Sequence, residues 1–132
     1  MNPEALYARF RTNVLSGAPG LTADMCAADV VLDLPFAPPG APRRLAGREA
    51  VAAFTAAGRA ALPIRFDDFR DVALHRTADP DTLVAEYEIT GTTPSGHSAT
   101  AAFVLVLKSR DGLVSHWREY QDVAGIAREL GT

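Results

Sequence analysis

The second half of the chain has the period of β-strands and keeps it almost to its end. Four segments of alternating polar and apolar residues follow one another from about residue 64 to residue 122. The separating turns are short and rich in Asp, Pro, Ser and Gly, as in Pro94-Ser95-Gly96 and Arg110-Asp111-Gly112. Strands joined by such turns pair antiparallel. We therefore expect a curved antiparallel meander, with a bulge where the alternation slips at Asp67-Asp68.

The first half has mainly the period of helices. A helix is predicted over residues 3–16, because Asn2 can cap it, Pro3 fits its first position and Gly17 can end it. The sequence further predicts a short helix over 23–28, a strand over 30–36, a stiff loop over 37–46, a helix over 48–62 and a closing helix over 123–130. Helices followed by consecutive strands define an α+β domain rather than a βαβ fold.

Composition limits the domain count and the classes of partner. A chain of 132 residues with 48% hydrophobic and 22% charged residues is long enough for one core, so residues 1–132 are predicted to form a single domain. The net charge of −3 disfavours nucleic acid and anionic membranes as main partners. No segment approaches the roughly 20 apolar residues of a membrane span.

The single cysteine and the first residues indicate the compartment. Cys26 cannot form an internal disulfide. Residues 1–4 lack the basic region and apolar core that begin a signal peptide. We therefore expect a reducing, cytoplasmic setting.

The last predicted strand carries the densest set of chemically active side chains. Its period of two places Ser115, Trp117, Glu119 and Gln121 on one face and His116, Arg118, Tyr120 and Asp122 on the other. If the first face lines a cavity, Glu119 is a carboxyl group beside an indole, and burial there raises its pKa toward the range of a general acid or base. The alternative is that Glu119 pairs with an arginine on an exposed face. A slip of one residue would exchange the two faces.

A second carboxyl group is a candidate on a neighbouring strand. Glu86 can join Glu119 as a paired carboxylate, in which one pKa rises. The plain interpretation is that Glu86 and Glu88 face solvent while Leu83, Ala85, Tyr87 and Ile89 face the core.

The remaining polar candidates give weaker signals. His97 and His116 are retained as candidates, although the spacing of the histidines and the lone Cys26 indicate neither a metal site nor a cofactor site. Asp33 is expected to point away from the core and to be solvated or bonded within a turn.

The order of these elements resembles the SnoaL-like polyketide cyclase and ketosteroid isomerase-like branch of the nuclear transport factor two-like superfamily. Three passages carry the resemblance: Asp33-Leu34-Pro35-Phe36 leading to Gly47-Arg48-Glu49, then Arg110-Asp111-Gly112, then Arg118-Glu119-Tyr120. The resemblance implies a cone-shaped, cystatin-like α+β barrel whose curved sheet wraps around N-terminal helices. It also implies a cavity for an apolar small molecule and a homodimer packed through the sheet, for which Val104 and Val106 are the outward apolar positions.

The resemblance transfers catalytic residues unevenly. The acids and the tyrosine of ketosteroid isomerases correspond to Leu34, Phe103 and Phe10, so that mechanism is not matched. Trp117-Arg118-Glu119-Tyr120 is similar to a stretch of limonene epoxide hydrolases in which the acid is catalytic, and to the Arg-Glu-aromatic stretch of phenazine biosynthesis isomerases. The resemblance therefore favours Glu119 as the acid.

Two hypotheses follow. The first is an enzyme that uses Glu119, with or without Glu86, for isomerisation, cyclisation or hydrolysis of an apolar or polycyclic metabolite. The second is a domain of the same fold that only binds a ligand or dimerises. The predicted apolar lining is Tyr7, Phe10, Leu34, Phe36, Phe54, Phe103, Leu105 and Trp117.

Overall fold

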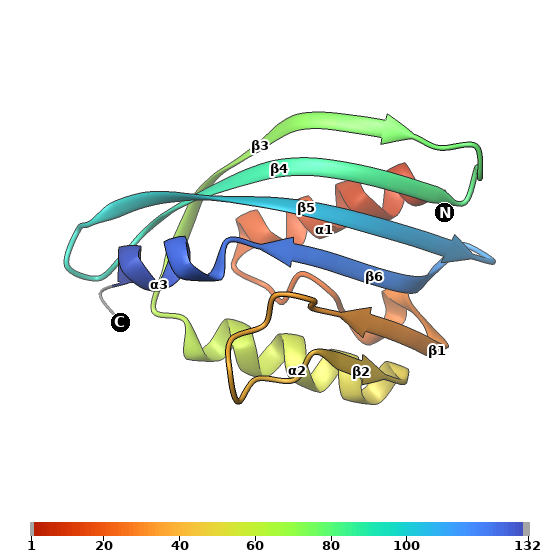
Figure 1. Cartoon of the computed structure of the whole chain (residues 1–132), viewed down its shortest axis with the longest axis horizontal. Coiled ribbons are helices and arrows are strands. Elements are labelled where there is room, and N and C mark those ends of the chain that lie inside the picture. The colour runs from red at the N-terminus through yellow and green to blue at the C-terminus, as the bar shows by residue number, and fades with distance from the viewer. Residues whose placement is uncertain (1, 131–132) are drawn as a thin grey trace.

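In the computed structural model, which describes residues 2–130, one curved and open sheet of six strands carries the fold (Figure 1). The spatial order of the strands is β2-β1-β6-β5-β4-β3. Their bounds are β1 (Cys26–Asp33), β2 (Arg44–Ala46), β3 (Arg65–Arg76), β4 (Thr82–Thr92), β5 (Ser98–Arg110) and β6 (Leu113–Gln121). The helices are α1 (Pro3–Ser16), η1 (Ala23–Met25, a 3-10 helix), α2 (Arg48–Ala61) and α3 (Val123–Leu130). The predicted α+β class is confirmed.

Helix α1 begins and ends where its caps are. The Asn2 side chain accepts a hydrogen bond from the backbone N–H of Ala5 at 2.8 Å, which satisfies one of the free donors of the first turn. Gly17 ends the helix in the left-handed conformation, with φ of 83°. Its buried stripe of Leu6, Tyr7, Phe10 and Val14 packs on the inner face of the sheet.

The four strands β3 to β6 form the predicted meander. Every neighbouring pair among them is antiparallel. The ladder between β3 and β4 shifts between Phe66 and Asp68, which confirms the expected bulge, and again between Asp71 and Ala73. The β5–β6 hairpin turns through Asp111 and Gly112, whose φ values of 54° and 79° are both positive, as a tight hairpin turn requires.

The other edge of the sheet differs from the prediction. Strand β1 pairs parallel with β6, so the sheet is mixed rather than purely antiparallel, and it does not close into a barrel. A parallel pair needs a long crossover, and α2 with β3–β5 supplies it. The predicted loop over 37–46 contains β2, which extends the sheet by pairing Arg44–Ala46 with β1. The predicted helix over 23–28 is only one turn, since β1 starts already at Cys26.

The core lies between the inner face of the sheet and helices α1 and α2. Tyr87 on β4 stacks on Phe69 with ring centroids 4.8 Å apart and on Phe103 at 5.1 Å. Phe10 of α1 contacts Trp117 edge-on at 4.7 Å. Helix α3 lies at the end of the sheet nearest the C-terminal end of α2 (Figure 1). A cavity opens at this end of the sheet, lined by Leu62 after α2 and by residues of α3.

Candidate active site

Trp117, Glu119 and Gln121 form a polar cluster on the inner face of β6, in otherwise apolar surroundings. Trp117 is 1% exposed, and its indole N–H donates to Glu119 Oε2 at 2.9 Å. The Gln121 side-chain amide donates to Glu119 Oε1 at 3.2 Å. Because the three residues alternate along one strand, period two places them on one side, and both oxygens of the carboxyl group are held by neutral donors.

The surroundings of Glu119 favour its neutral form. Although the residue retains some exposed surface, desolvation of the carboxyl group raises its pKa, and the hydrogen bonds from Trp117 and Gln121, together with the nearby Tyr87 hydroxyl, only partly oppose this. No arginine, lysine or histidine in the described part of the chain forms an ion pair with it. A carboxyl group without a counter-ion is the kind that can exchange a proton near neutral pH.

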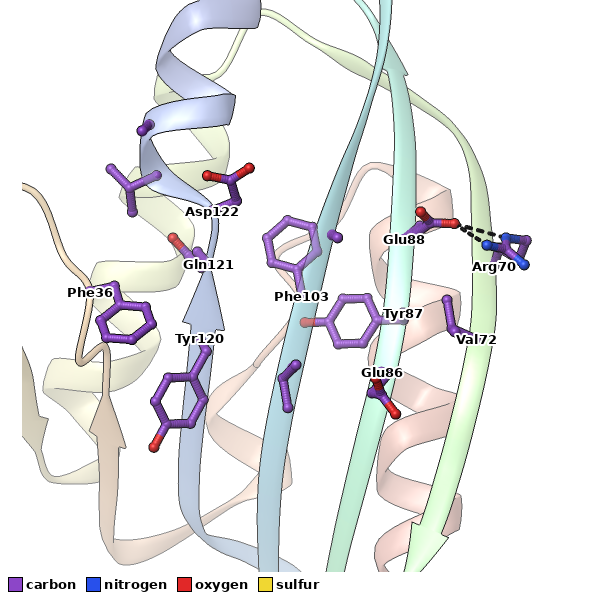
Figure 2. Close-up of a pocket in the computed structure, with 14 residues that line it drawn as sticks. Phe36, Arg70, Val72, Glu86, Tyr87, Glu88, Phe103, Tyr120, Gln121 and Asp122 are labelled. Carbon is purple, nitrogen blue, oxygen red and sulfur yellow. Dashed lines mark hydrogen bonds and ion pairs between the residues drawn. The ribbon is translucent and has the colours of Figure 1, made fainter.

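Tyr87 adds an unsatisfied hydroxyl beside this group. The residue is 1% exposed, and its hydroxyl lies near the Glu119 carboxyl group but makes no hydrogen bond of ordinary geometry within residues 2–130. Burial raises its pKa well above the ordinary value, and the nearby Glu119 carboxylate raises it further. Figure 2 shows Tyr87 extending from β4 toward β5, beside Phe103. A buried hydroxyl without a partner costs free energy, so a ligand oxygen that bonded to it would recover that cost.

Two hollows lie near this cluster, and we call them the end cavity and the outer groove. The end cavity, of about 390 Å³, opens between α3, the C-terminal end of α2 and the inner face of the sheet. Its walls are mainly apolar, with Ile64, Phe66, Ile89, Ala101, Phe103 and Ile126 among them. This size and lining are typical of small-molecule sites.

The outer groove, of about 670 Å³, lies on the opposite face of the sheet (Figure 2). It contains Phe36 and Tyr120, whose rings meet edge-on at 5.4 Å. It also contains Glu86, and Glu88 paired with Arg70. This groove is wide and open, in contrast to the end cavity.

Glu119 lines neither hollow: the sheet itself separates it from the outer groove, and Gln121 and Phe103 stand between it and the end cavity. The register pairs Tyr87 with Phe103 and Phe103 with Gln121 across three strands. Phe103 and Gln121 line the end cavity, and Glu119 lies one position further along β6 on the same face. The Gln121 amide is therefore both a partner of the carboxyl group and part of the cavity wall.

The structure brings together some of the sequence-predicted site residues and separates others. Glu119, Trp117 and Phe103 lie within this region. Glu86 does not join Glu119: its carboxylate pairs with His75 at 2.7 Å on the outer face. Tyr7, Phe10, Leu105 and Trp117 are buried core residues, Leu34 and Phe54 pack against the core, and Phe36 is 61% exposed at the outer groove.

The outer face also contains a charged cluster that sequence reasoning missed. Asp33 is 9% exposed rather than solvated as predicted. It accepts from Arg44 Nε at 2.7 Å and lies 2.6 Å from His116 Nε2. The Arg44 hydrogen bonds lower its pKa to about 2. The parallel pairing of β1 with β6, which the sequence did not reveal, places Asp33 near His116.

His97, the other histidine candidate, lines the end cavity at its mouth. Its Nε2 is 3.0 Å from Glu129 of α3. Within residues 2–130, no three His, Cys, Asp or Glu side chains gather closely enough to hold a metal ion. No helix in that range is long and apolar enough to cross a membrane.

A curved sheet packed over helices is the arrangement that the resemblance to nuclear transport factor two-like proteins implies. The chain belongs to the SnoaL-like domain family, which it matches over residues 4–117. The match ends two positions before Glu119.

Sequence relatives agree with this assignment. An uncharacterised PhzA/B-like protein of Pseudomonas aeruginosa is 36% identical over 91 residues, which are 68% of this chain and 62% of that relative. The uncharacterised protein YesE of Bacillus subtilis is 27% identical over 104 residues, 78% of this chain and 69% of that protein. The chain thus spans less than two thirds of the Pseudomonas relative.

Solved structures share the fold. A candidate isomerase from Bacillus subtilis superposes with a TM-score of 0.86 at 22% identity, over 98% of this chain and 92% of that one. A candidate polyketide cyclase from Xanthomonas campestris gives 0.76 at 20%, over 97% and 96%. An epoxide hydrolase from Mycobacterium tuberculosis gives 0.66 at 17%, over 96% and 86%. At these identities the likeness concerns the fold alone.

Proposed function

We propose that this SnoaL-like protein binds an apolar small molecule in the end cavity and acts on it by general acid–base chemistry through Glu119. The observation that supports this most directly is a carboxyl group with a raised pKa, fixed by two neutral donors and close to an apolar cavity. The names of the structural neighbours, which include an isomerase, polyketide cyclases and an epoxide hydrolase, suit proton-transfer chemistry.

The cluster supplies two separate contributions to such a reaction. Ionised Glu119 takes a proton from a carbon beside a carbonyl group and returns it elsewhere, because its raised pKa makes it a stronger base than an ordinary glutamate. The Tyr87 hydroxyl donates to the substrate oxygen on which negative charge develops. Trp117 keeps the carboxyl group in place during both steps.

Access to Glu119 requires a movement of Gln121. In the structure the Gln121 amide lies between the cavity and the carboxyl group. A substrate that enters the cavity turns this side chain away and replaces its hydrogen bond. The free energy lost in this movement is small, because the hydrogen bond from Gln121 to Glu119, at 3.2 Å, is long for an amide donor.

Proton exchange on a simple probe tests this proposal without knowledge of the natural substrate. A bicyclic ketone incubated with the protein in D₂O exchanges the hydrogens beside its carbonyl group, and NMR follows the rate. Glu119→Gln is expected to lower the catalysed rate at least about a hundredfold, because the amide cannot take the proton. Glu86→Gln is the matched control and is expected to leave the rate unchanged, since Glu86 lies on the outer face.

The pH dependence of the same exchange provides a second test. The rate should rise with pH as Glu119 ionises and level off above its raised pKa. A cyclic epoxide, assayed in parallel, covers the hydrolytic variant of the reaction. Exchange that Glu119→Gln leaves intact would assign the chemistry to another group.

A non-catalytic binding domain is the second candidate, and one observation favours it. Glu119 lines neither the end cavity nor the outer groove, so a ligand can fill the end cavity without contacting the acid. If the wild-type protein binds the ketone and processes neither probe, this second function is supported over the first.

We also propose that the outer face packs against a second copy of the chain. Val104 and Val72 are 37% and 47% exposed there, and Phe36 is 61% exposed. Glu86 on β4, whose partner within the chain is His75, lies to one side of Val104, and Arg118 on β6 lies diagonally on the other side. A two-fold axis near Val104 would bring each acidic side against the basic side of the partner. Sedimentation should show a dimer at micromolar concentration and a monomer for Val104→Glu.

A further inference from the structure

The inner wall of the end cavity is the end of a row of aromatic rings that crosses the sheet. Tyr87 on β4 stacks on Phe69 of β3 with ring planes 12° apart, and on Phe103 of β5 with ring planes 16° apart. Phe103 lines the end cavity, whereas Tyr87 and Phe69 do not. The next position of the ladder, on β6, is Gln121, which also lines the cavity. The boundary between cavity and core therefore runs along Phe103 and Gln121.

On the cavity side of this row the side chains become small. Period two along β5 places Phe103, Ala101 and Ala99 on the inner face, and all three line the end cavity. Gly91, which pairs with Ala99, lines it from β4. Space is left where methyl groups and a hydrogen atom follow a phenyl ring, because the backbone of the two strands keeps its spacing. The Phe103 ring is thus the point at which the cavity ends.

The reactive groups of the site lie on the core side of the same row. Across β5 and β6, Gln121 pairs with Phe103. Glu119 pairs with Leu105, which is the next inner-facing rung away from the cavity. The Tyr87 ring is stacked against Phe103, and its hydroxyl lies near the Glu119 carboxyl group. A substrate in the cavity therefore has to pass between Phe103 and Gln121 to reach either group.

The two sides of this passage differ in how firmly they are held. Gln121 is partly exposed, and its amide makes one hydrogen bond of 3.2 Å to Glu119. Phe103 packs against the hydrophobic core and stacks on Tyr87, which in turn stacks on Phe69. Turning Gln121 away loses one long hydrogen bond, whereas turning Phe103 away breaks the row of rings. Phe103 is therefore the fixed side of the passage.

We propose that Phe103 is a specificity-determining residue, whose ring lets only substrates with an unbranched carbon beside the reacting carbonyl group reach Glu119. The proposal rests on the proposed function, because it takes Glu119 as the reacting acid, and it names the class of substrate. Branching elsewhere in the molecule is accommodated by the cavity. A methyl group on the carbon that loses its proton meets the Phe103 ring, which the core holds in place.

Two ketones that differ by one methyl group test the substrate class. 1-Tetralone and 2-methyl-1-tetralone share a bicyclic skeleton, and only the second is branched at the carbon that exchanges hydrogen. Each exchange rate in D₂O is divided by the hydroxide-catalysed rate of the same ketone. The wild-type protein should then favour 1-tetralone at least about tenfold. Phe103→Ala should reduce this preference to less than about threefold by raising the rate of the methylated ketone, and Phe103→Leu should lie between the two.

Phe66→Ala is the matched control, because it removes the same ring from another wall of the same cavity. Phe66 pairs with Gly91, so it lies two inner-facing rungs from Tyr87 along β4. This variant should weaken binding of both ketones alike and keep the wild-type preference. Equal loss of preference in Phe66→Ala and Phe103→Ala, or a wild-type preference below about threefold, would overturn the proposal.

The fluorescence of Trp117, the single tryptophan, tests the barrier without any catalysis. Trp117 donates to Glu119 on the core side, so a small molecule that passes Phe103 reaches this pair. Acrylamide should quench Phe103→Ala at least about twofold more strongly than wild type, because the close packing at this wall is lost, and should quench Phe66→Ala like wild type. Absence of exchange by the wild type would refute the proposed function. Equal quenching of wild type and Phe103→Ala would instead refute the role of Phe103.

Discussion

Asp33 on β1 and Glu119 on β6 lie on neighbouring strands but on opposite faces of the sheet. Asp33 accepts two hydrogen bonds from the Arg44 guanidinium and contacts His116, and its pKa falls to about 2. Glu119 accepts only from a neutral indole and a neutral amide, and desolvation raises its pKa. Both carboxyl groups are mostly withdrawn from water, so the presence of a cation decides the direction of the shift.

This difference separates a structural carboxylate from a reactive one. The charged form of Asp33 is stabilised in the folded state and links β1, β2 and β6. The charged form of Glu119 is destabilised, and the Tyr87 hydroxyl beside it is also unsatisfied. A folded protein retains such locally destabilising groups where they bind a ligand or take part in a reaction. The difference between the two carboxyl groups should appear in the stability of the folded state.

The largest effect is expected for Asp33→Asn. Removal of the charge leaves Arg44 and His116 without their acceptor, and the free energy of unfolding should fall by about 2 kcal/mol at pH 7, as measured by urea unfolding. Because the folded-state pKa of Asp33 lies below its ordinary value of 3.8, its stabilisation is complete above that value and disappears as the pH falls to about 2. The difference between wild type and variant should shrink over this range.

A nearby carboxylate provides the control for this variant. Asp29 pairs with Arg110 on the surface, where its side chain is 71% exposed. Asp29→Asn should change the unfolding midpoint little, since solvent screens such a pair. Equal losses for the two variants would mean that the burial of Asp33 adds nothing to its ion pairs.

Two tyrosines of the core provide the next test. The Tyr7 hydroxyl donates to Asp71 at 2.7 Å, whereas the Tyr87 hydroxyl makes no hydrogen bond of ordinary geometry within residues 2–130. Tyr7→Phe should therefore lower the free energy of unfolding by about 1 kcal/mol. Tyr87→Phe should leave it unchanged or raise it by up to about 1 kcal/mol, and should slow proton exchange. Equal destabilisation by both would show that Tyr87 has a partner in solution.

For Glu119→Gln, stability and activity should change in opposite directions. The amide cannot ionise, so the variant escapes the cost of a desolvated charge, and its stability at pH 7 should equal or exceed that of wild type by up to about 1 kcal/mol. The raised folded-state pKa sets the sign: wild type is most stable, relative to the variant, below the ordinary glutamate pKa of 4.5, and loses this advantage as the pH rises through the raised value. Thermal unfolding of both proteins from pH 4 to pH 8 measures the difference.

Local signals were enough to predict most of the fold. The helix bounds at Asn2 and Gly17, the bulge at Asp67-Asp68 and the turn at Asp111-Gly112 depend on neighbours in sequence, so the residues themselves indicate them. The parallel pairing of β1 with β6 and the strand β2 depend on contacts between distant segments, for which period and turn residues give no signal.

The site was predictable only in part, for the same reason. Period two along β6 relates Trp117, Glu119 and Gln121 without any long-range information. The hypothesis that Glu86 joins Glu119 is wrong: alternation places Glu86 on the face opposite Tyr87, and the structure shows it paired with His75. The cavity walls depend on where α3 and the end of α2 meet the sheet, so most of the apolar residues predicted to line it belong to the core.

The smallest effect is expected where a carboxylate is paired and also exposed. Glu86 contacts His75 at 2.7 Å, but the two side chains are 44% and 52% exposed, so water and salt weaken the pair. Glu86→Gln should change the free energy of unfolding by less than about 0.5 kcal/mol, which a urea titration resolves as a nearly unchanged midpoint. The same variant serves as the control for proton exchange, so its stability must be known. A larger loss would mean that a second copy of the chain covers Glu86 in solution, because burial in an interface strengthens an ion pair. The loss should then vanish in the monomeric Val104→Glu background.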